Sequence, residues 1–387
     1  PIAGPPAVSL EAFIRAIALD PGFGPAYEHM PALLLSLGRP EEARRAAATY
    51  LSLDPTSPHR GETRLAALLL DTSGIGRAEA ESMLDTTSIF TVWLAVFQQG
   101  LASWPDTAET AIRLLRRLGE SGRGAGGAPP WVLDSVMWPT YLAHALAFRG
   151  HLREAFAVNE RLLRQPSASE WTGFLDPLLD LSLLGIVPDS LARATFDGAF
   201  EAAADWGPFY APRHLRGLPW WLSRGDTAAL ARFGAQAART ARAPASPYAA
   251  LRARLLGETS VAFLDLARGD SVSAIRKLRA IPDTLCLADS YAANCFHLNQ
   301  TLARLLAARG DDRRAGALLE RWRWSGGRTP SFVLATLELG RIAERLGDTR
   351  KAAECYGFVM AAWRRPDPEL LPYVAEARDG LARLRVE

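Results

Sequence analysis

The chain has 387 residues, of which 49% are hydrophobic and 22% are charged. These proportions are typical of a well-packed globular protein and exclude an intrinsically disordered one. With 44 basic and 42 acidic residues the net charge is only +2. No strong overall field therefore favours nucleic acid or an anionic membrane, and neither is predicted as a partner.

The tripeptide Leu-Asp-Pro ends two apolar-periodic segments near the N-terminus. It occurs at residues 19–21 and 53–55, and the second copy closes the segment GPAYEHMPALLLSLGRPEEARRAAATYLSLDP. The pattern predicts two helices joined by a short turn. Residues 9–19 read as the second helix of an equivalent hairpin that lacks its first helix. Because an unpaired helix leaves an apolar face uncovered, we expect the natural polypeptide to extend further toward its N-terminus.

Two segments in the first third of the chain bear on its organisation. Residues 86–105 carry no charged side chain, which raises the question of a membrane span. Polar residues at 98–100 interrupt the stretch, so it predicts a buried helix and no span. Residues 121–130, SGRGAGGAPP, formally contain GxGxxG but follow a helical pattern and lead into two prolines. We therefore predict a loop there, separating an N-terminal array (1–120) from a C-terminal array (131–387).

A glycine followed five residues later by an alanine recurs between helix-periodic segments. The glycine tolerates the backbone angles of a tight turn, and the alanine allows two helices to cross closely. Gly225 keeps the turn but has Leu230 at the alanine position. In the last unit, Gly340 occupies a small position of the first helix and Tyr356 an aromatic position of the second. The five complete pairs are Gly38 and Ala43, Gly150 and Ala155, Gly269 and Ala274, Gly310 and Ala315, and Gly347 and Ala352.

These features resemble the tetratricopeptide repeat (TPR), whose period is 34 residues. The two Leu-Asp-Pro copies have that spacing, whereas the later turn glycines are 44, 41 and 37 residues apart. The resemblance covers residues 9–55 and 247–363, extends to 131–164 and 208–241, and is absent from about 60–130. It implies an all-α fold, a right-handed α-solenoid of stacked and partly degenerate helical hairpins. The alanine- and arginine-rich composition suggests a bacterial source.

The resemblance also implies where a partner would bind. TPR arrays hold peptides on a concave face lined by the first helix of each unit. Arg304 and Arg341 could bind a carboxylate or phosphate there. The alternative is that they are ordinary solvated helix residues. The predicted partner-binding residues are His144, Phe263, His297, Gln300, Arg304, Glu338 and Arg341.

No known catalytic or metal-binding motif is present, and the six histidines are scattered rather than paired. Three cysteines without CxxC spacing argue against a disulfide framework and a zinc site. We therefore predict no catalytic residues, no metal and no cofactor. Eleven tryptophans could line a groove or fill gaps between irregularly spaced helices. We favour filling, and Trp220 and Trp221 cannot both face the core of one helix.

The sequence predicts a non-catalytic scaffold that binds a protein or peptide partner on its concave face. One alternative is the sensor or regulatory region of a larger bacterial signalling protein, either a serine/threonine kinase or a transcriptional activator. Another is an enzyme whose site is assembled between repeats. An oligomer is possible, and both a cytoplasmic and a periplasmic location remain open.

Overall fold

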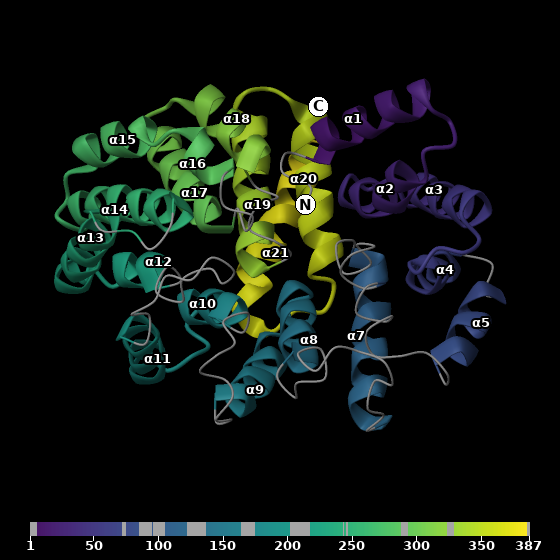
Figure 1. Ribbon diagram of the computed structural model, residues 1–387. Coiled ribbons are helices and arrows are strands. Elements are labelled where there is room, and N and C mark those ends of the chain that lie inside the picture. The colour runs from purple at the N-terminus through teal and green to yellow at the C-terminus, as the bar shows by residue number, and fades with distance from the viewer. Residues whose placement is uncertain are drawn as a thin grey trace. The chain divides into compact units, whose positions relative to one another are not determined.

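The structure is a computed structural model in which all regular elements of the described residues are helical (Figure 1). The predicted all-α class of stacked helical hairpins is confirmed. Helix labels follow Figure 1. The described residues are 6–71, 75–84, 95, 105–121, 137–163, 175–201, 217–242, 244, 247–287, 293–322 and 329–384.

Two compact units divide the chain, residues 1–149 and 150–387. In the first unit, consecutive helices pack against each other, most extensively α2 against α3. Its described helices are α1 (Pro6–Leu19), α2 (Gly24–Ser36), α3 (Pro40–Leu53), α4 (Arg60–Leu69), α5 (Ile75–Leu84), α7 (Pro105–Ser121) and α8 (Met137–Phe148).

The second unit repeats the same arrangement. Its main pairs are α13 with α14, α14 with α15, α17 with α18 and α19 with α20. Its described helices are α9 (Leu152–Leu163), α10 (Leu175–Leu183), α11 (Asp189–Glu201), α12 (Gly217–Ser223), α13 (Thr227–Arg242), α14 (Pro247–Ala267), α15 (Ser271–Ala280), α16 (Asp283–Leu287), α17 (Ala293–Ala307), α18 (Asp312–Trp322), α19 (Pro330–Arg345), α20 (Thr349–Ala362), the 3-10 helix η6 (Pro368–Leu370) and α21 (Leu371–Leu384).

Left-handed glycines end the helices at every turn that the sequence predicts. Only glycine adopts such angles without steric cost, which is why this residue punctuates the repeats. A seventh glycine of the same kind, Gly185 between α10 and α11, lacks the alanine and was missed by the sequence pattern. The predicted turn glycines have φ of 72° at Gly38, 83° at Gly150, 61° at Gly225, 86° at Gly269, 80° at Gly310 and 78° at Gly347.

An aspartate directly after the turn glycine starts the next helix in several hairpins. The carboxylate of Asp348 accepts a hydrogen bond of 3.0 Å from the backbone N–H of Lys351. Asp270 does the same for Ser273 at 2.9 Å. Each carboxylate satisfies an N–H that the first helical turn leaves unpaired. The Gly-Asp dipeptide therefore ends one helix and begins the next.

The alanines five residues after the turn glycines lie at the helix crossings, as predicted. Ala43, Ala155, Ala274, Ala315 and Ala352 all have no exposed surface. Burial of this kind leaves no room for a larger side chain without moving the paired helix.

The start and the end of the second unit are joined by hydrogen bonds. The backbone N–H of Asp367 donates to the carbonyl of Gly150 at 2.9 Å. The Asp367 carboxylate in turn accepts from the backbone N–H of Arg153, and the Arg153 guanidinium pairs with Glu369 at 2.7 Å. The second unit is therefore a solenoid that closes on itself.

A buried carboxylate makes a second long-range connection in this unit. Asp180 of α10 accepts from the backbone N–H of Ser331 at 3.1 Å and from its hydroxyl at 2.5 Å, across 151 residues of sequence. Ser331 lies in the first turn of α19, so the carboxylate also faces the positive end of that helix. Asp180 thereby anchors α19 to the first part of the unit.

Several predictions concern residues that lie outside the described ranges, and one prediction needs correction. The loop at 121–130 and most of the uncharged stretch at 86–105 lie outside the described residues, so the predicted domain boundary stays a prediction. Among the described helices none is both long and apolar enough to cross a membrane. Cys295 is disulfide-bonded, which corrects the expectation that the cysteines form no disulfide, whereas Cys355 is buried and is not disulfide-bonded.

Candidate functional site: the Arg304 face

Two helices of the second unit carry most of the predicted partner-binding residues. On α17, spacings of three and four residues place His297, Gln300 and Arg304 on one helix face. On α19, Glu338 and Arg341 are likewise three residues apart. Both helices precede a turn glycine, so each is the first helix of its hairpin.

Three of the predicted residues are buried or belong to the first unit. Phe263 of α14 is only 1% exposed and belongs to the core. Gln300 is 5% exposed, and its side-chain amide donates to the carbonyl of Ser331 at 3.5 Å. His144 is half-buried in α8 of the first unit. Their role in partner binding stays a prediction, and Phe263 and Gln300 could contact a partner only after the core around them rearranges.

Arg341 is held by two carboxylates. Its guanidinium forms a two-pronged pair with Glu376 of α21, at 2.5 and 2.6 Å, and contacts Glu338 at 2.7 Å. These hydrogen bonds, Glu376 first, raise the pKa of Arg341 above its usual value. Arg341 therefore joins α19 to α21, and its charge is already compensated within the chain.

Arg304 has a different environment. Its side chain is exposed to solvent, yet burial by the surrounding protein lowers the pKa of its guanidinium. Glu338 opposes this effect through its charge, and Arg341 adds to it. Arg304 forms no ion pair with any other described residue.

We name the surface formed by Arg304, Glu338, Arg341, Tyr373 and Glu376 the Arg304 face. Sequence reasoning missed Tyr373 and Glu376, because the repeat resemblance was followed only to residue 363. A helical pattern continues in LPYVAEARDGLARL, and Glu376 lies 35 residues after Arg341, close to one repeat length. That spacing is the signal that could have found it.

The Arg304 face can bind an anion but holds no evident reactive group. One guanidinium is engaged by two carboxylates, and the neighbouring one is available for a bidentate pair with a carboxylate. Among the described residues, no three His, Cys, Asp or Glu side chains are grouped so that they could hold a metal ion.

Comparisons with known proteins find only weak structural similarities. No protein-family model matches the chain, and no curated protein does so either. The crystal structure of the APC/C hetero-tetramer Cut9–Hcn1 is similar with a TM-score of 0.34 and 12% identity, over 97% of this chain and 81% of that chain. The structure of Naa15/Naa10 bound to HypK-THB gives 0.20 and 15%, over 98% and 71%. At these scores they carry no conclusion about function.

The hairpins themselves define the class. Glycine-terminated helix pairs, buried alanines at the crossings and stacking of successive pairs make this a TPR-like helical-repeat protein in its fold. Its irregular repeat lengths distinguish it from a regular TPR array.

Proposed function

We propose that the chain is a non-catalytic scaffold for protein–protein interaction that binds an acidic peptide segment on the Arg304 face. The observation that carries this proposal is the state of Arg304, which is accessible, partly desolvated and without an ion-pair partner among the described residues. Desolvating a cation without a partner is unfavourable, so a carboxylate supplied by another protein would gain more here than at a fully solvated arginine.

Peptides selected from a random display library against the full chain provide the test. Their affinity should be measured by fluorescence anisotropy for the wild type, Arg304→Ala and the double variant with Arg341→Ala. We expect Arg304→Ala to weaken binding about tenfold, which corresponds to one charged hydrogen-bonded pair. The double variant should bind more weakly still, with a smaller dependence on salt concentration.

The matched control is Arg314→Ala. Arg314 is an exposed arginine of α18 that pairs with Asp311 in its own first turn, so its loss should leave the affinity unchanged. Far-ultraviolet circular dichroism should show the same helix content for all variants. Equal affinities of the wild type and the double variant would exclude the Arg304 face as the peptide site.

The wider setting of the scaffold stays a prediction. A sensor or regulatory region would be preceded by a kinase or DNA-binding segment, and peptide mapping of the native polypeptide upstream of residue 1 would detect it. If such a segment is found, the Arg304 face becomes the input site of a bacterial signalling protein.

A further inference from the structure

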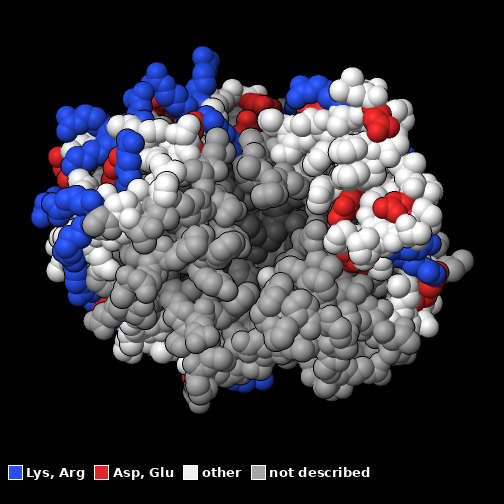
Figure 2. Space-filling view, viewed as in Figure 1, with Lys and Arg blue, Asp and Glu red and all other residues white. Residues whose placement is uncertain are grey.

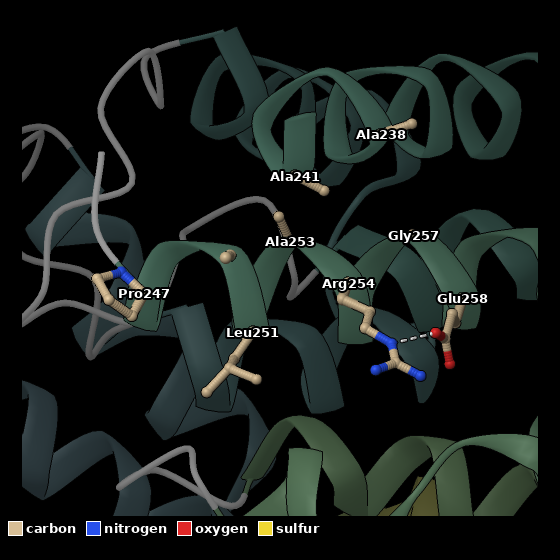
Figure 3. Close-up of a pocket in the computed structure, with 9 residues that line it drawn as sticks. Ala238, Ala241, Pro247, Leu251, Ala253, Arg254, Gly257 and Glu258 are labelled. Carbon is tan, nitrogen blue, oxygen red and sulfur yellow. Dashed lines mark hydrogen bonds and ion pairs between the residues drawn. The ribbon is translucent and has the colours of Figure 1, made fainter. Parts of the chain in front are cut away.

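An open groove lies on the second unit, on helices other than those of the Arg304 face. It has a volume of about 630 Å³ between α13 and α14. Figure 3 shows Leu251 and Arg254 projecting from α14, with Ala238 and Ala241 of α13 across the groove. The remaining lining residues are Pro247, Ala250, Ala253, Gly257 and Glu258.

The groove continues onto α15. A second hollow of about 430 Å³ shares Arg254, Gly257 and Glu258 with the first and adds Val261, Lys277 and Ala280. We name the two hollows together the α14 groove. Two large apolar side chains are exposed along its floor, Leu251 at 40% and Val261 at 43%. They are ten residues apart on one helix, which is about 15 Å.

The walls of the α14 groove suit a helix as occupant. Ala238 and Ala241 on one side, Ala250 and Gly257 on the floor and Ala280 on the other side are all small. Small side chains let a second helix approach closely and bury its own larger side chains between them. A stretch of about 15 Å corresponds to roughly three helical turns.

The charge of the region selects the chemistry of that helix. Residues 227–280, which span α13, α14 and α15, contain nine basic and three acidic residues, whereas the whole chain has 44 and 42. All three acidic side chains are engaged within the chain. Glu258 pairs with Arg254, Asp265 pairs with Lys277, and Asp270 caps α15.

Basic side chains remain beside the groove without acidic partners among the described residues. Arg242 follows Ala238 by four residues on α13, and Arg276 precedes Ala280 by four on α15. That spacing places each arginine on the same helix face as a groove wall. Figure 2 shows Lys and Arg side chains gathered where Figure 1 places these helices.

We infer that the α14 groove is a docking site for an acidic amphipathic helix of a partner protein. The apolar stripe of this helix contacts Leu251 and Val261, and its carboxylates face Arg242 and Arg276 on the two sides. Small walls fit a helix better than they fit stacked bases, which need aromatic platforms. The site goes beyond the Arg304 face, since the two surfaces use different helices.

A defined probe tests this inference on the full chain. The probe is a fluorescein-labelled helical peptide with a Leu/Ala stripe flanked by glutamates. A scrambled peptide of the same composition and a version with lysine for glutamate serve as controls. Anisotropy titrations should show binding of the acidic amphipathic peptide at least about tenfold tighter than either control.

Two groups of variants locate the site. Leu251→Asp, and separately the pair Arg242→Glu with Arg276→Glu, should each weaken binding of the acidic peptide about tenfold or more. The matched controls are Leu346→Asp, at a leucine 48% exposed in the turn after α19, and the pair Arg313→Glu with Arg350→Glu, at exposed arginines of α18 and α20. These make the same chemical changes outside the groove and should leave the affinity unchanged.

Each other outcome overturns the inference. Equal binding of the scrambled peptide, or equal loss with the control variants, would mean nonspecific charge attraction. Tighter binding of single-stranded DNA of equal charge would identify a polyanion surface instead. A concentration-dependent dimer in sedimentation velocity that Leu251→Asp abolishes would identify a second copy as the occupant. Arg304→Ala should not affect the acidic helix, so failure here is separate from failure of the Arg304 face.

Discussion

The helices α19–α21 and α11–α13 fill the space at their helix crossings in different ways. In α19–α21 a single ring, Tyr356 of α20, lies between two glycines. A Cβ atom added to Gly340 of α19 would lie 2.9 Å from the Tyr356 ring, and one added to Gly380 of α21 would lie 2.5 Å from it. The absence of side chains at these two positions therefore makes the space that the ring occupies.

In α11–α13 large rings surround a bulky crossing residue, and among the described residues there only Trp221 lies against a glycine, Gly217, where an added Cβ atom would be 2.7 Å from the ring. Leu230 stands where the other hairpins have alanine, and Trp220 and Trp221 are 1% and 0% exposed. The Trp220 ring is 5.6 Å from that of Phe196 in α11, and the Trp221 ring is 6.0 Å from that of Phe233 in α13. The adjacent tryptophans thus pack against the preceding hairpin and their own hairpin, and both are buried. The sequence predicted only that the two could not both face the core of one helix.

The comparison teaches that this fold accepts leucine in place of alanine at a helix crossing when large side chains nearby fill the space between the helices. It also favours the interpretation of these two tryptophans as packing residues rather than as the lining of a groove. The stability of the hairpin with tryptophans should then depend on its buried rings. The stability of the hairpin with glycines should depend on the absence of side chains at Gly340 and Gly380.

The largest expected loss of stability follows from removing a buried tryptophan ring in α11–α13. Trp221→Ala removes a fully buried indole and should lower the free energy of unfolding by about 3–5 kcal/mol. Urea denaturation followed by circular dichroism measures the change. Trp221→Phe keeps most of the apolar contact and should cost less. A loss below about 1 kcal/mol for the alanine variant would mean that the ring does not support α12 and α13.

The next largest loss of stability is expected from filling the space beside the Tyr356 ring in α19–α21. Gly380→Val places side-chain atoms where the Tyr356 ring lies, and overpacking of this kind should cost about 1–3 kcal/mol or more. The matched control is Gly357→Ala, because nothing lies within 4 Å of a Cβ atom added there. That substitution inside α20 should stabilise the protein by about 0.5–1 kcal/mol. If both variants behaved alike, the close approach at Gly380 would not matter.

The sequence predicted what is local and periodic. Each crossing alanine follows its turn glycine by five residues, because each hairpin must reverse direction and pack in the same way, although the hairpins themselves differ in length. The connections from Asp180 to Ser331 and from Arg153 to Glu369 span 151 and 216 residues. They depend on how small rotations between successive hairpins add up, which no local pattern records.

The candidate site shows the same difference between what local sequence predicts and what depends on tertiary packing. Arg304, Glu338 and Arg341 were named from the sequence, because the repeat resemblance places partner-binding residues on the first helix of each hairpin. That resemblance alone could not separate the accessible Arg304 from the buried Phe263 and Gln300, since burial depends on neighbouring helices. The same limit applies to Glu376, whose contact with Arg341 required the position of α21.

The smallest expected effect concerns the polar end of the Tyr356 ring. Its hydroxyl donates to Glu344 at 2.6 Å, and the same carboxylate accepts two hydrogen bonds from Arg383, at 2.7 and 2.9 Å. Arg383 first, and then Tyr356, hold the pKa of Glu344 below its usual value. A carboxyl group with a lowered pKa in the folded state adds stability above its unfolded pKa. That contribution is lost as the pH falls through the folded value.

Glu344→Gln should therefore lower the free energy of unfolding at pH 7 by about 1 kcal/mol, mainly because the amide is a weaker acceptor for the hydroxyl of the buried Tyr356. Solvent screens the exposed Arg383, which limits its share. The difference between wild type and variant should shrink as the pH falls below the ordinary glutamate pKa of about 4.3 and vanish below the lowered pKa of Glu344 in the folded state. Urea denaturation at a series of pH values measures this. A difference that stayed constant with pH would mean that the carboxylate charge contributes nothing, and that the glycines alone fix the Tyr356 ring.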